Sequence, residues 1–80
     1  MNDFLPRTRQ VLCQVFDISS APAYARIDSL GRWDSHRFLY LILALEEEFD
    51  MEFEPEDTDE MTTVTGLSKI IEMRCKLKTL

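Results

Sequence analysis

Two serines that each follow an aspartate are the residues of this chain best suited to carry chemistry. Asp28-Ser29 and Asp34-Ser35 fall within one stretch of eight residues. A serine hydroxyl at the start of a helix lies against the positive end of the helix dipole, where a covalently attached phosphate is stabilised. The choice between the two serines therefore depends on which one begins the helix that follows.

The residues after Ser35 predict an uninterrupted helix over 35–49. This segment has no Gly or Pro, and its apolar residues recur at helical spacing, at Phe38, Leu41, Ile42, Leu45 and Phe49. A helix begun at Ser29 would hold Gly31 in its first turn, and its apolar stripe would start late. We therefore expect Ser35 at the helix start with Asp34 beside it. The residues alone leave this pair open to two interpretations, a simple cap and an attachment point.

The remaining patterns predict an all-α fold, a small bundle of three longer helices and one short helix. Apolar spacing favours helices over about 4–16 and 62–80, the latter capped by Thr63, and Pro55 is expected to start the short helix between them. Segment 17–33 is predicted to be a long loop between the first two long helices. Within it, Leu30 and Trp33 are expected to cover the end of the bundle.

Length and charge narrow the class of protein. Eighty residues with 45% hydrophobic content fit a single domain, 1–80, with a real core. The net charge is −6, and ten of the fifteen acidic residues lie between Glu46 and Glu60. So acidic a surface repels nucleic acid and anionic membranes, and it suits a basic protein partner.

The cysteines and the apolar runs indicate a cytoplasmic protein. Cys13 and Cys75 form no Cys-x-x-Cys pair and have no histidine at ligand spacing, so we expect free thiols and no metal site. The first residues have no signal-type apolar run, and the longest apolar run, 38–45, is too short to cross a bilayer. We expect a monomer that does not insert into membranes.

Three blocks at fixed spacing carry a family resemblance. Asp34-Ser35-His36 is followed by a helix that ends in Ala44-Leu45-Glu46-Glu47-Glu48-Phe49, then by an acidic loop, and then by Thr62-Thr63-Val64. Over roughly residues 33–75 this arrangement resembles the acyl carrier protein family. Counting back from Ala44, the register of the resemblance places the family's modified serine on Ser35 and not on Ser29.

The resemblance implies a carrier that does no catalysis itself. A phosphopantetheinyl transferase would attach 4'-phosphopantetheine from coenzyme A to Ser35, with Asp34 assisting the transferase's metal-bound complex. Acyl groups would ride on the arm as thioesters in a fatty acid, other lipid, polyketide or further specialised pathway. The implied partners are acyl-loading, acyl-transferring or ketosynthase-type enzymes with basic docking surfaces. The implied partner-facing residues are His36, Leu39, Leu43, Glu46 and Glu47.

Three residues depart from the family pattern. His36 stands where the family has leucine, and Arg37 and Tyr40 replace residues that are usually small, polar or acidic. The departures favour a specialised carrier over one for general fatty acid synthesis. With no paired acid evident, His36 itself is most simply a surface residue.

The bundle predicts where an acyl chain would lie. Seven core positions are the candidate lining, namely Phe16, Ile42, Leu45, Phe49, Val64, Leu67 and Ile71. Aromatic residues fill much of so small a core, which favours a short or polar cargo.

Three other classes of protein compete with this interpretation. A calcium-binding loop from Asp50 fails, because Pro55 and Met61 stand where that loop needs glycine and glutamate. An aminoacyl or peptidyl carrier and a non-modified acidic helical adaptor stay open.

Overall fold

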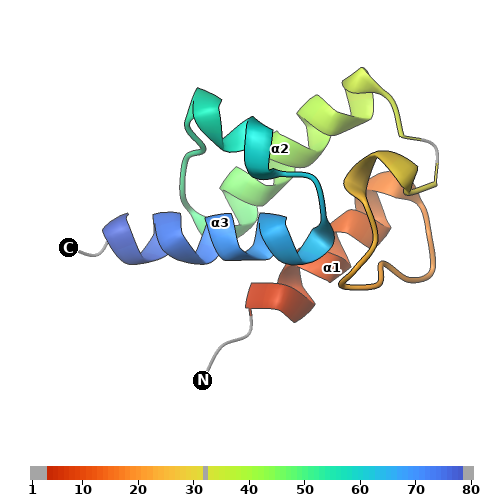
Figure 1. Ribbon diagram of the computed structural model, residues 1–80, viewed down its shortest axis with the longest axis horizontal. Helices are drawn as coiled ribbons and strands as arrows, with labels where there is room; N and C mark the ends of the chain where they lie inside the picture. Colours follow the sequence, from red (N-terminus) through yellow and green to blue (C-terminus); the bar gives the residue numbers. More distant parts are fainter. Residues whose placement is uncertain (1–3, 32, 79–80) are drawn as a thin grey trace.

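The chain folds into three α-helices with two short 3-10 helices between them. The structure, a computed structural model, describes residues 4–31 and 33–78, with the side chain of residue 78 left out. The helices are α1 (Phe4–Phe16), η1 (Ile27–Ser29), α2 (Ser35–Phe49), η2 (Pro55–Glu60) and α3 (Val64–Lys78) (Figure 1). This confirms the predicted all-α bundle. The three-residue η1 inside the first connection was not expected.

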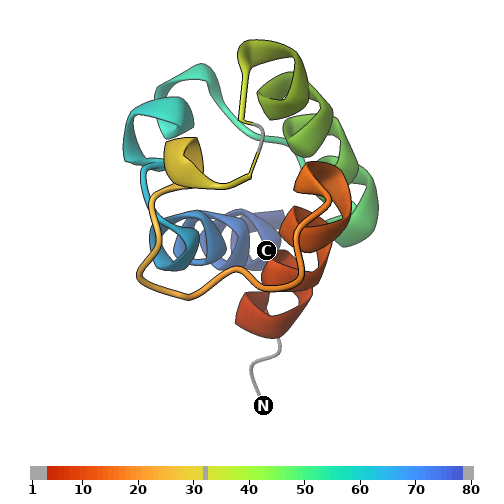
Figure 2. The same cartoon turned by 90° about the vertical axis from the view of Figure 1, so that its right-hand side faces the viewer.

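The hydrophobic core lies where the three long helices meet. Helix α1 contacts both α2 and α3, and η2 packs on α3 (Figure 2). The fully buried apolar side chains include Leu12, Phe16, Leu41, Leu45, Val64, Leu67 and Ile71. Burying each of these stabilises the fold by roughly 1.5–3 kcal/mol. The apolar stripe predicted for α2 is therefore its core face, with Phe38 and Ile42 half-buried at its edges.

Both ends of α2 are fixed by local hydrogen bonds. The Asp34 carboxylate accepts a hydrogen bond of 2.7 Å from the backbone N–H of Arg37, as an N-cap does. At the other end Asp50 adopts the left-handed conformation, with φ of 53°, and its N–H donates to the Glu46 carbonyl. The predicted bounds of this helix are confirmed. Thr63 likewise caps α3, since its hydroxyl accepts from the Gly66 N–H at 3.0 Å.

The connection from α1 to α2 is held against the start of α3. Ile27 N–H donates to the Thr62 carbonyl at 2.9 Å, and Val64 N–H donates to the Ala25 carbonyl at 3.0 Å. The side chains of Ala21, Ile27 and Leu30 are buried. The middle of the loop that the sequence predicts is therefore joined to the start of α3 by backbone hydrogen bonds.

Gly31 makes the last turn of this connection possible. Its φ is +46°, and a Cβ built there would lie 2.7 Å from the Ile18 Cγ2 atom. A side chain at this position would meet both backbone strain and a steric clash.

Trp33 does not cover the end of the bundle as expected. Leu30 is 6% exposed and is buried at this end of the bundle, whereas Trp33 is 40% exposed. Its ring lies 6.4 Å from the ring of Phe38, tilted by 51°. The indole therefore lies at the rim of the bundle, partly packed and partly in solvent.

Candidate functional site

Ser35 is the first residue of α2, and it is exposed. Asp34 accepts from the N–H of Arg37. The N–H groups of Ser35 and His36, in the same first turn, have no partner within the helix and lie at its positive end. Among the described residues, the Ser35 hydroxyl has no hydrogen-bond partner. A phosphate ester on this hydroxyl would meet both free N–H groups and the helix dipole.

Ser29 lacks both features: it does not begin an α-helix, and its hydroxyl is already hydrogen-bonded. It closes the three-residue η1, which is too short to have an appreciable dipole, and the chain continues from Leu30 in an extended conformation. Its hydroxyl donates a hydrogen bond of 2.8 Å to the Arg26 carbonyl. Only the second Asp-Ser pair therefore opens a helix.

An apolar row runs along α2 from Ser35. Leu39 and Leu43 follow Ser35 at intervals of four residues, which places the three side chains one above another on the helix. Leu39 is 64% exposed and Leu43 is 65% exposed, so both present apolar surface to solvent. His36 and Glu47 are also exposed. Four of the five predicted partner-facing residues are therefore exposed along α2.

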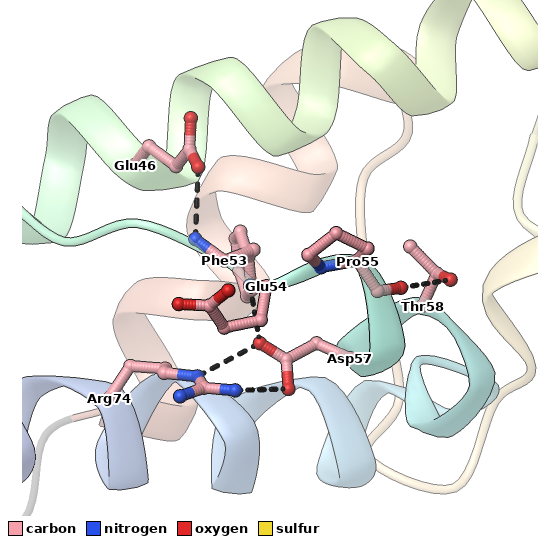
Figure 3. Close-up of polar contacts among 7 residues, drawn as sticks. All are labelled: Glu46, Phe53, Glu54, Pro55, Asp57, Thr58 and Arg74. Atoms are coloured by element: carbon pink, nitrogen blue, oxygen red, sulfur yellow. Dashed lines mark hydrogen bonds and ion pairs between the residues drawn. The ribbon is translucent and has the colours of Figure 1, made fainter.

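Glu46 differs from the other predicted partner-facing residues. Its side chain is half-buried, and its Oε2 atom accepts a hydrogen bond of 3.0 Å from the Phe53 backbone N–H (Figure 3). The carboxylate therefore holds the connection after α2 against the helix. It belongs to the fold as well as to the acidic surface.

Asp57 and Arg74 form an ion pair that sequence reasoning missed. The guanidinium of Arg74 bonds both carboxylate oxygens of Asp57, which also accepts from the Glu54 N–H at 2.8 Å (Figure 3). Asp57 is only 4% exposed. The hydrogen bonds from Arg74 hold the pKa of this carboxyl below its ordinary value. Pro55 and Asp57 do signal the start of a short helix, but no local pattern points to a partner seventeen positions away.

The seven predicted acyl-lining residues all belong to the hydrophobic core. Six are buried and Ile42 is half-buried at the edge. A pocket of about 690 Å³ opens elsewhere, between α1 and α2, and none of the seven lines it. Its lining consists of Gln14, Val15, Asp34, His36, Arg37, Tyr40 and Ala44.

Within 4–31 and 33–78, no three His, Cys, Asp or Glu side chains gather where they could hold a metal ion. No helix in this part of the chain has the length and apolar character needed to cross a bilayer. Cys13 and Cys75 are free thiols and half-buried.

Comparison with known proteins finds relatives in sequence and neighbours in structure. No protein-family model matches the chain. The "Acyl carrier protein" of Bdellovibrio bacteriovorus is 30% identical over 74 residues, which are 89% of this chain and 94% of that protein. The solution structure of a holo acyl carrier protein from Geobacter metallireducens has a TM-score of 0.85 at 20% identity, covering 98% of this chain and 92% of that one. A chain in the structure of the ishigamide ketosynthase/chain length factor has a TM-score of 0.75 at 22% identity, covering 95% of this chain and 99% of that one.

Proposed function

This chain belongs to the acyl carrier protein family, and we propose that it carries acyl groups as thioesters on a 4'-phosphopantetheine arm attached to Ser35. The observation that carries the proposal is the position of Ser35, exposed at the first residue of α2 and next to the capping Asp34. The fold shared with a holo acyl carrier protein supports the same group.

The residues around Ser35 would hold the phosphate end of the arm. The free N–H groups of Ser35 and His36 and the dipole of α2 favour the negative charge of a phosphodiester. The arm, when bound, supplies a terminal thiol on which the acyl group is esterified. The protein would perform no catalysis, so the bases and oxyanion donors for each reaction come from its partner enzymes.

Partner enzymes would meet the protein on the exposed face of α2. Leu39 and Leu43 offer apolar contact beside Ser35, and Glu47 adds charge at their edge. Such a face suits transient docking to a basic surface, on a phosphopantetheinyl transferase first and on acyl-transferring enzymes afterwards. The structural likeness to a chain in a ketosynthase/chain length factor structure supports ketosynthase-type partners and a polyketide or other specialised pathway.

The test is modification of the purified protein. It is incubated with coenzyme A and a broad-specificity phosphopantetheinyl transferase, and the product is measured by intact mass and peptide mapping. We expect one added phosphopantetheine on Ser35, lost in Ser35→Ala and kept in Ser29→Ala. Addition to Ser29, or no addition, would overturn the proposal and favour a non-modified adaptor.

A further inference from the structure

The pocket between α1 and α2 combines a mainly apolar surface with several polar side chains that could bind a ligand. Gln14, His36, Arg37 and Tyr40 supply an amide, an imidazole, a guanidinium and a phenol. Three of them, His36, Arg37 and Tyr40, are the departures from the family pattern found in the sequence. The residues that set this chain apart therefore gather at one place in the fold.

The pocket begins beside the attachment point. Asp34 and His36, the two neighbours of Ser35, both line it. Along α2 the row that contains His36, Tyr40 and Ala44 lies next to the row that contains Ser35. Ala44 is nine residues beyond Ser35, about 14 Å along the helix axis. A flexible chain tethered at Ser35 can thus cross to the neighbouring row and follow it.

The walls of the pocket are held in place by a contact between the two helices. Arg37 Nη1 donates a hydrogen bond of 2.8 Å to the Val15 carbonyl near the end of α1. A guanidinium has five N–H donors, so this bond leaves others for a ligand. On the opposite side of α2 the interior is packed, with Leu45, Leu67 and Ile71 each no more than 1% exposed.

We propose that this pocket holds the pantetheine arm together with the carbonyl-bearing part of its cargo. The inference rests on the attachment to Ser35 proposed above. The positive charge of Arg37 and the donors of Gln14 and Tyr40 match the phosphate and amide carbonyls of the arm. The same donors favour an acyl group with further carbonyl oxygens over a saturated chain, because each further oxygen offers them an acceptor, whereas a saturated chain contacts only the apolar part of the lining.

The experiment compares two cargoes of equal length by NMR. Uniformly 15N-labelled protein is prepared without the arm, with the arm, and loaded with butyryl or acetoacetyl groups, each state verified by intact mass. We expect the arm to shift the amide signals of Val15 and Tyr40, and acetoacetyl to shift them further than butyryl does. The signals of Leu67 and Ile71, across α2, should stay in place.

Two matched variants separate the pocket from the rest of α2. Ala44→Trp would fill the pocket and should remove the shifts at Val15, whereas Leu43→Trp, on the exposed row one residue away, should keep them. Tyr40→Phe should reduce the difference between the two cargoes.

Three results would overturn the inference. Shifts confined to Leu67 and Ile71 would place the cargo in the interior between α2 and α3. If Ser35 gains the expected mass but the Val15 and Tyr40 signals do not shift, the attachment to Ser35 is supported and binding of the arm in the pocket is refuted. A protein that gains no mass on Ser35 would overturn the attachment itself, and the pocket with it.

Discussion

Arg74 of α3 holds Asp57 of η2 through two parallel hydrogen bonds of 2.9 Å, from Nε to Oδ2 and from Nη2 to Oδ1. Planar pairing of this kind fixes orientation as well as distance. Because Asp57 is buried, Arg74 also compensates a charge that would otherwise oppose folding. The pair therefore ties the acidic segment between α2 and α3 to the body of the protein.

We expect Asp57→Asn to lower the thermal midpoint by several degrees. The change removes the negative charge and one of the two oxygens that accept from Arg74 and the Glu54 N–H, and it puts an NH2 donor in the place of that oxygen. Thermal unfolding followed by circular dichroism measures the loss. Asp59→Asn is the control, because Asp59 is exposed on the same short helix. Equal midpoints for the two variants would contradict this role of the pair.

The contribution of Asp57 should depend on pH in a defined direction. Its pKa is lowered in the folded protein from an ordinary 3.8. A lowered pKa stabilises the fold above the unfolded value, and that stabilisation is lost as the pH falls through the folded value. The difference in unfolding free energy between the wild type and Asp57→Asn should therefore be constant from neutral pH to about pH 5 and shrink in more acidic solution. Urea titrations at several pH values measure it, and a difference that grows on acidification would refute the sign.

Thr8 is a site where a substitution should stabilise the protein. Its side chain is fully buried in α1, and its Oγ1 atom has no hydrogen-bond partner among the described residues. Thr8→Val replaces the hydroxyl by a methyl group of similar size, so we expect a gain of about 1 kcal/mol in unfolding free energy. Thr8→Ala removes the methyl as well and should lose stability by leaving a gap. Chemical denaturation of both variants tests this, and a less stable Thr8→Val would show that the hydroxyl is satisfied in solution.

Glu46 and Glu47 should respond differently to charge reversal. Glu47→Lys should slow loading by the transferase without changing the thermal midpoint, because Glu47 is exposed. Glu46→Lys should lower the midpoint too, since it removes the acceptor for the Phe53 N–H. Loading rates measured at increasing salt concentration give the electrostatic contribution to docking, because exposed charges are screened beyond about 10 Å at 0.1 M salt. A wild-type rate that does not fall with salt would mean that the acidic face only keeps the protein soluble.

Acyl chains of increasing length should stop stabilising the protein early. Phe16 and Phe49 are 1% and 8% exposed and occupy the interior that a long chain would need. Each buried methylene is worth about 0.8 kcal/mol, so even a few would raise the midpoint visibly. Thermal unfolding of the arm-bearing protein with acetyl, butyryl, octanoyl and palmitoyl groups makes the comparison. A midpoint that climbs through the longest chain would show that the core opens to admit it.

Local signals in the sequence predict the helices well and their connections poorly. Asp34 marks the start of α2 through capping, and the spacing of Leu41 and Leu45 marks its core face, because both effects act within a few residues. The prediction for Trp33 is wrong, because Leu30 is buried at the end of the bundle and Trp33 is 40% exposed. The sequence does not tell which of these two apolar side chains is buried.

The candidate site shows the same division. The register of the family motif predicts Ser35 at a helix start, and α2 begins at Ser35 in the structure. The hydrogen bond from Phe53 to Glu46 and the pair of Asp57 with Arg74 join residues whose approach depends on how α2, η2 and α3 pack. No residue spacing within a single element contains that information, and the pocket beside Ser35 likewise exists only once α1 lies against α2.

The hydrogen bonds between the α1–α2 connection and the start of α3 join residues that are far apart in the order of synthesis. The Thr65 hydroxyl donates to the Ala23 carbonyl across 42 positions. In the backbone, Val64 N–H donates to the Ala25 carbonyl, and the Thr62 carbonyl accepts from Ile27 N–H. Residues emerge from the ribosome in order, so the turn that precedes Ser35 cannot take its final shape until residue 65 has been made. A modifying enzyme that requires the finished turn would therefore act only on the folded protein.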